Sequence, residues 1–201
     1  DAHAIPRTDV IARAKAFAFH PWHCAQPNLT ASCNAAYKSI YTPGDYVGLP
    51  YDWGGYMTLF EFDQGILAGK GAGSYPDDGV LACTVGLDCS GFVSKAWATG
   101  RYTTSNLADT STMIDVSALL AGDVFNKAGY HVAMFSSLLA NGDPAIYESA
   151  GYNVHYTEGA GWSYLDGYIP RRFTGITGNS AADPSGTPAN PIVIGSLPHT
   201  D

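Results

Sequence analysis

The order of the apolar patterns constrains the fold of this 201-residue chain more than any other feature. Apolar residues recur at helical spacing in residues 8–19 and 88–99, whereas runs of strand type follow from residue 122 onward. Helices followed by strands are typical of an α+β domain, because a parallel α/β sheet needs strands and helices that alternate. We therefore predict N-terminal helices packed on a central antiparallel β-sheet.

The strand-like segments predict a hairpin and two further strands. The runs 131–135 and 145–148 flank Asn141-Gly142-Asp143, which is typical of a hairpin turn. Residues 152–156 and 167–173 are the next two candidates. These segments predict an antiparallel sheet in the second half of the chain.

Two stretches of the chain show neither the helical nor the strand-like spacing of apolar residues. Residues 21–50 are rich in Pro, Gly, Asn, Ser and Tyr and predict a long loop, a length that often indicates function. Residues 176–201 are rich in Pro, Gly and Ser and predict a C-terminal tail. We therefore expect one domain over residues 1–175, followed by that tail.

Composition and charge exclude several classes of protein. The chain has 10 basic and 18 acidic residues, a formal net charge of -8, so nucleic acid is not an expected partner. No apolar run is long enough to cross a bilayer, so no membrane span is expected. The sequence opens at Asp1-Ala2-His3 without a leader, which fits a secreted protein after removal of its signal peptide, or a trimmed chain. We expect a secreted, periplasmic or extracellular protein.

The four cysteines predict different roles. Cys24 and Cys33 flank a short loop containing Pro and Asn, and we predict a disulfide between them. If Cys89 stays a thiol, Cys83 is either buried and free or paired with Cys24 or Cys33. The sequence leaves this choice open.

A zinc site is an alternative for part of the same region. His20, His23, Cys24 and Cys33 could in principle bind the ion, but their spacing matches no standard structural zinc site. We therefore expect neither a metal nor another cofactor.

Cys89 is the candidate nucleophile. It lies in the first turn of the helix predicted over residues 88–99, directly after Asp88, which can cap that helix. A helix N-terminus with a nearby imidazole favours the reactive thiolate. The free N–H groups of the first turn can also hold an oxyanion that develops on an attacked carbonyl.

The base must come from another part of the chain. His131 at the start of a predicted strand is the first candidate, and His155 is the second. Glu148 on the neighbouring strand could orient the imidazole of His131. The sequence therefore predicts a Cys89, His131, Glu148 triad.

Four motifs in order carry a resemblance to a known family. They are Tyr51-Asp52-Trp53-Gly54-Gly55, Leu87-Asp88-Cys89-Ser90-Gly91-Phe92-Val93, Gly122-Asp123-Val124-Phe125 and Tyr130-His131-Val132-Ala133-Met134. Over about residues 8–173 the chain resembles the NlpC family of papain-like cell-wall cysteine peptidases. The resemblance implies a papain-like NlpC fold.

The resemblance assigns roles to the triad. The family's nucleophile, general base and orienting residue fall on Cys89, His131 and Glu148. Many members carry His, Asn or Gln at the third position, so Glu148 departs from the pattern, and Ser149 beside it is an alternative.

Further roles follow from the same resemblance. It implies that Tyr51 donates its hydroxyl near the reacting carbonyl, and that Asp88 and Ser90 recognise the free amino end of a stem peptide. A second departure is the glycine-containing insertion over residues 56–82, which could form one wall of the cleft.

The implied activity is hydrolysis of peptidoglycan peptides, between D-γ-glutamyl and a diamino acid, through an acyl-enzyme on the cysteine and without a cofactor. We expect a monomer. Two alternatives are an N-acetylmuramoyl-L-alanine amidase or acyltransferase on the same scaffold, and an inert cell-wall-binding module.

Overall fold

The computed structural model describes residues 4–178, which form a mixed α/β structure compatible with the predicted α+β class. Its helices are α1 (Arg7–Ala18), α2 (Leu59–Leu67) and α3 (Cys89–Ala96). Its strands are β1 (Ile5–Pro6), β2 (Pro21–Cys24), β3 (Gly44–Val47), β4 (Gly71–Ala72), β5 (Thr84–Val85), β6 (Ser111–Met113), β7 (Val124–Lys127), β8 (His131–Leu138), β9 (Pro144–Ala150), β10 (Asn153–Thr157), β11 (Ile169–Phe173) and β12 (Ile176–Thr177). No helix among these residues has the length and apolar character needed to span a bilayer.

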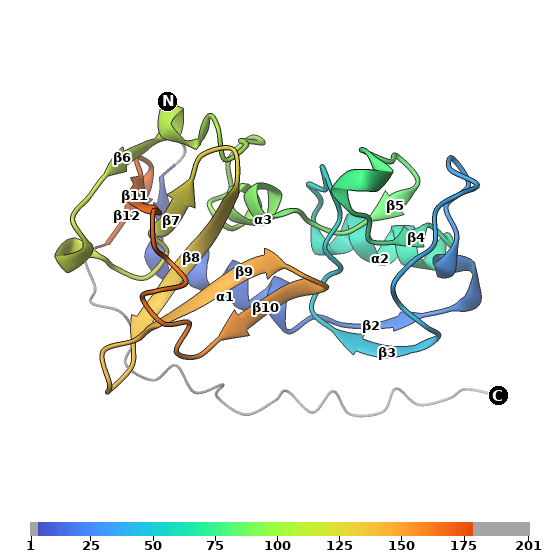
Figure 1. The fold of residues 1–201 in the computed structure, drawn as a ribbon, viewed down its shortest axis with the longest axis horizontal. Coiled ribbons are helices and arrows are strands. Elements are labelled where there is room, and N and C mark those ends of the chain that lie inside the picture. Colours follow the sequence, from blue (N-terminus) through green and yellow to red (C-terminus); the bar gives the residue numbers. More distant parts are fainter. Residues whose placement is uncertain (1–3, 179–201) are drawn as a thin grey trace.

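The largest sheet has six strands in the order β10-β9-β8-β7-β11-β6, and all neighbours are antiparallel. Figure 1 shows this sheet on one side of the molecule, with α2 and the short strands β2 to β5 on the other. The predicted hairpin is the pair β8 and β9, and the two further predicted strands are β10 and β11. An antiparallel sheet in the second half of the chain is thus confirmed.

Helices α1 and α3 pack against each other and against the sheet, where both contact β9. Phe17 of α1 meets Phe92 of α3 edge to face, with ring centroids 6.3 Å apart. At the other end of α3, Trp97 stacks on Phe173 of β11 at 5.2 Å. Because these rings are buried, they fix where α3 begins relative to the sheet, and α3 begins at Cys89.

The first helix begins slightly earlier than its pattern predicts. Pro6 is its N-cap, in place of Thr8 or Asp9, and Ile5–Pro6 is held as β1 against β12. The buried side chain of Arg7 also donates to Asp123 at 2.8 Å. Long-range contacts at this end therefore override the local capping signal.

The region predicted as loop and insertion contains regular structure. β2 pairs with β3 across the long segment 21–50, and β4 pairs with β5. Helix α2 lies within the insertion and begins with a capping box, in which Thr58 and Glu61 satisfy each other's backbone N–H groups. The predicted tail begins at residue 176, and its first two residues form β12. Residues 179–201 of this tail lie outside the described residues.

The predicted disulfide between Cys24 and Cys33 is wrong. Cys33 is bonded to Cys83, 50 positions away, and Cys24 is a free, buried thiol. The side chain of Cys24 is buried in the main apolar core, whereas Cys33 lies in a turn facing the segment before β5. Chain proximity suggested the wrong partner because the fold buries Cys24 in the core and leaves Cys33 at the surface.

The disulfide is expected to make a large contribution to stability. In the chain-entropy account, a loop of this length corresponds to about 4 kcal/mol at 25 °C. A Cys33→Ala, Cys83→Ala double variant should therefore unfold at a clearly lower urea concentration than the oxidised protein. Equal midpoints for the two would contradict the expected contribution.

Candidate active site

Three titratable side chains share one face of the sheet on adjacent strands. His155 of β10 is directly opposite Glu148 of β9. The register that pairs Met134 with Tyr147 places Glu148 across from Ala133, so His131, two residues earlier on β8, points to the same side. The sheet therefore brings His131, Glu148 and His155 together, although they are up to 24 positions apart in sequence.

The imidazole of His131 lies between a thiol and a carboxylate. Its Nε2 is 2.7 Å from Oε2 of Glu148. The Cys89 thiol lies near enough to the same ring to raise the pKa of His131. Since Nε2 is engaged by Glu148, Nδ1 is the nitrogen that remains for the sulfur. The structure thus brings together the three residues predicted as a triad.

The surroundings of His131 and Glu148 favour the charged form of both side chains. Burial alone would lower the pKa of His131, but the nearby Cys89 and the hydrogen bond with Glu148 raise it to about 9. Burial alone would raise the pKa of Glu148, but hydrogen bonds from His131, His155 and Tyr164 lower it to about 2. An imidazolium next to a carboxylate is therefore the stable form near neutral pH.

The second candidate base contacts the carboxylate. His155 has its Nε2 3.6 Å from Oε1 of Glu148, and its Nδ1 is 3.0 Å from the carbonyl of Asn153. This ion pair with Glu148 raises the pKa of His155. The alternative third residue, Ser149, is buried and donates to the carbonyl of Leu87 at 2.6 Å. Of the alternatives, the geometry therefore favours His131 as base and Glu148 as its partner.

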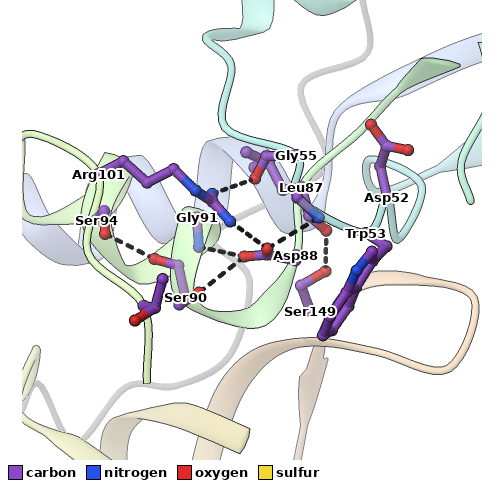
Figure 2. Close-up of polar contacts among 12 residues, drawn as sticks. Asp52, Trp53, Gly55, Leu87, Asp88, Ser90, Gly91, Ser94, Arg101 and Ser149 are labelled. Carbon is purple, nitrogen blue, oxygen red and sulfur yellow. Dashed lines mark hydrogen bonds and ion pairs between the residues drawn. The ribbon is translucent and has the colours of Figure 1, made fainter. Parts of the chain in front are cut away.

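Asp88 fixes the N-terminus of α3, as Figure 2 shows. One oxygen accepts from the backbone N–H of Gly91 at 2.6 Å and from the Ser90 hydroxyl at 3.0 Å. The other accepts from the N–H of Gly54 at 3.1 Å and from Arg101. These bonds hold the first turn, and with it Cys89, in one position.

The glycines of two sequence motifs permit a close approach of the chain at this point. A Cβ on Gly91 would lie 2.0 Å from the carbonyl oxygen of Gly55, and one on Gly55 would lie 2.5 Å from that of Gly86. Arg101 donates to the Gly55 carbonyl at 2.9 Å, so the same arginine joins both motifs (Figure 2). The glycines are thus needed for the close packing of the chain around Cys89.

The residues expected to bind substrate differ in their surroundings, because Tyr51 lines a cavity and Asp88 and Ser90 are buried. Tyr51 lines a cavity together with His131, and burial followed by the charge of Cys89 raises the pKa of Tyr51. Asp88 and Ser90 are buried, and the carboxylate of Asp88 is bonded by internal donors. Tyr51 therefore lies beside His131 at the cavity, whereas Asp88 primarily caps the helix.

The cavity beside His131 is lined mainly by aromatic rings. It has a volume of about 300 Å³, and its tyrosines are Tyr51, Tyr75, Tyr130, Tyr164 and Tyr168. A neighbouring cavity of about 500 Å³ is lined by Glu148 and His155 and shares Tyr164 with the first. The two cavities offer an extended substrate more than one point of contact beside the triad.

The residues considered for zinc do not converge. Cys33 is in the disulfide, and His23 bonds Asp45 at 2.7 Å. His20 bonds Asp63 at 2.7 Å. Within residues 4–178, no group of three or more His, Cys, Asp or Glu side chains could hold a metal ion.

Two residues of the site were missed in the sequence. Arg101 follows the end of α3 and returns to Asp88 at its start, a contact that no local pattern indicates. Tyr164 lies in a glycine-containing loop between β10 and β11 and donates to Glu148. Neither belongs to a periodic segment, so only the folded chain shows their place.

Comparisons of the chain with models of protein families, with curated proteins and with solved structures gave no match. The chemistry of the site is therefore inferred from its own residues. A thiol at a helix N-terminus, an imidazole near it and a carboxylate bonded to that imidazole are the parts needed for nucleophilic catalysis.

Proposed function

We propose that this chain is a cysteine peptidase that hydrolyses an amide bond of peptidoglycan stem peptides. The observation that carries the proposal is the position of His131, whose Nε2 is 2.7 Å from Oε2 of Glu148 and whose pKa is raised by the Cys89 thiol. That array resembles a nucleophile, base and orienting group in both order and geometry. A papain-like NlpC fold is part of the same proposal.

In the first half of the reaction, the Cys89 thiolate attacks the amide carbonyl. The N–H groups of Cys89 and Ser90 are candidates for the oxyanion, because the Asp88 side chain takes that of Gly91. Tyr51 is positioned to add a hydroxyl donor. The carbon–nitrogen bond then breaks, the leaving amine takes the proton of His131, and a thioester remains on Cys89.

In the second half, water hydrolyses the thioester. Neutral His131 takes a proton from the water, whose oxygen bonds to the acyl carbon. The carbon–sulfur bond breaks, and the sulfur leaves as the thiolate beside the new imidazolium. Glu148 stabilises this imidazolium at each step because it remains bonded to Nε2.

The substrate class rests on the order of the sequence motifs. Tyr51–Gly55, Leu87–Val93 and the strand that begins at His131 meet around the thiol. Their combination resembles enzymes that cleave between D-γ-glutamyl and a diamino acid. The disulfide is compatible with an oxidising compartment outside the cytosol, where peptidoglycan is accessible.

Digestion of purified peptidoglycan tests the proposal. Incubation with the oxidised protein should release fragments that mass spectrometry assigns to cleavage after D-γ-glutamate, with one new amino group per cut. A parallel incubation with iodoacetamide-treated protein should give none, because alkylation blocks the sulfur. Fragments cut between muramic acid and L-alanine would indicate an amidase, and no fragments from either bond would contradict the proposal.

A further inference from the structure

Tyr164 contacts the charged end of the triad. It lies in the loop between β10 and β11, and its hydroxyl donates to Oε2 of Glu148 at 2.7 Å. The same oxygen is 2.7 Å from Nε2 of His131. The two donors thus converge on one carboxylate oxygen, while His155 faces the other oxygen at 3.6 Å.

In this arrangement the Tyr164 hydroxyl supplies one of the hydrogen-bond donors that the Glu148 carboxylate needs. A buried carboxylate needs donors for its oxygens, and Glu148 is only 4% exposed. Burial followed by the bond to Glu148 raises the pKa of Tyr164, so the hydroxyl keeps its proton and remains a donor. The groups that face Glu148 are therefore two imidazoles and one phenol.

We propose that Tyr164 is a positioning residue that holds the Glu148 carboxylate ionised and aligned with His131. Its ring lines both cavities beside the triad, so the residue that aligns the carboxylate also lies against bound substrate. The proposal rests on the proposed cysteine peptidase function and adds one residue to its machinery.

The test is Tyr164→Phe, which removes one oxygen and keeps the ring. The side chain is 43% exposed, so the variant should fold. Nuclear magnetic resonance of the Glu148 carboxyl carbon should show its pKa raised by about one pH unit, because the charged form loses a donor. Alkylation of Cys89 by iodoacetamide at pH 6, followed by peptide mass spectrometry, should slow about fivefold because the imidazolium is less well held. On peptidoglycan fragments, kcat should fall while KM stays the same.

Trp162→Phe is the matched control in the same loop. Trp162 donates to the carbonyl of Gly142 at 3.0 Å, so this variant also removes one hydrogen bond that anchors the loop. It should leave the Glu148 titration and the alkylation rate unchanged. An unchanged titration or alkylation rate in Tyr164→Phe, or equal effects in both variants, would overturn the positioning role. Both readouts work without substrate, so they decide the role of Tyr164 even if peptidoglycan is not cleaved.

Discussion

Replacing Cys89 with alanine is expected to reduce hydrolysis of peptidoglycan fragments by at least about 10³-fold. In the proposed mechanism the sulfur supplies the covalent bond of the acyl-enzyme, and of the two free thiols within residues 4–178 it is the one that raises the pKa of His131. The substitution removes one atom from a side chain that is 6% exposed, so the fold should persist. Rates of fragment release by chromatography, with circular dichroism as the check on folding, measure the effect.

Cys24 offers a matched control, because it is the other free thiol among the described residues and is also buried. Cys24 is the last residue of β2, and its side chain lies in the apolar core. Cys24→Ala therefore removes the same atom but changes no residue of the candidate site. It should keep the hydrolytic rate within about twofold and lose a small amount of stability. If Cys89→Ala were as active as Cys24→Ala, the thiol of Cys89 would not be the nucleophile.

The position of Cys89 in the first turn of a helix could be predicted because its determinants are local. Asp88 before an apolar helical pattern indicates an N-cap, and the structure has that cap, with the Gly91 N–H as its partner. A side chain in the first turn of a capped helix lies beside its free N–H groups whatever the rest of the chain does. Helix α3 is therefore the part of the site on which sequence and structure agree most closely.

The hairpin that joins the strands of His131 and Glu148 could be predicted for a similar reason, because the turn at Asn141-Gly142-Asp143 links them. Which residues of the two strands share a face depends in addition on a register shift between Phe135 and Ser137, and the turn does not indicate that shift. The structure confirms the hairpin and places Nε2 of His131 against the carboxylate. What the hairpin does not specify is the contact of Glu148 with Tyr164.

The contacts that the sequence did not indicate, or for which it indicated the wrong partner, join residues whose position depends on the folding of the whole chain. Cys33 finds Cys83 because the turn around residue 33 folds back on the segment before β5. Arg101 and Tyr164 reach the site from irregular chain, where no period indicates direction. Helix α2 is different, because Thr58 and Glu61 form the spacing of a capping box and could have indicated it.

Glu148→Gln is expected to cause the second large loss of activity, about 10²-fold in kcat/KM. The amide keeps nearly the same shape but has no charge, so it no longer stabilises the imidazolium. The pKa of His131 should fall from about 9 toward its ordinary value of 6.5. The basic limb of the pH–rate profile should move to lower pH with it. Glu158→Gln, the same change at an exposed position, should leave the profile in place.

Glu148→Gln should also change how the stability of the protein depends on pH. The pKa of His131 is raised in the folded protein, so its contribution is complete below about 6.5 and is lost as the pH rises through 9. The pKa of Glu148 is lowered, so its contribution is present above about 4.5 and is lost as the pH falls toward 2. Glu148→Gln should therefore be least stable relative to the parent between pH 4.5 and 6.5, by about 2 kcal/mol in urea unfolding, with the gap closing toward pH 9. A gap that stayed constant over this range would mean that loss of packing, and not loss of the charge pair, explains the inactive variant.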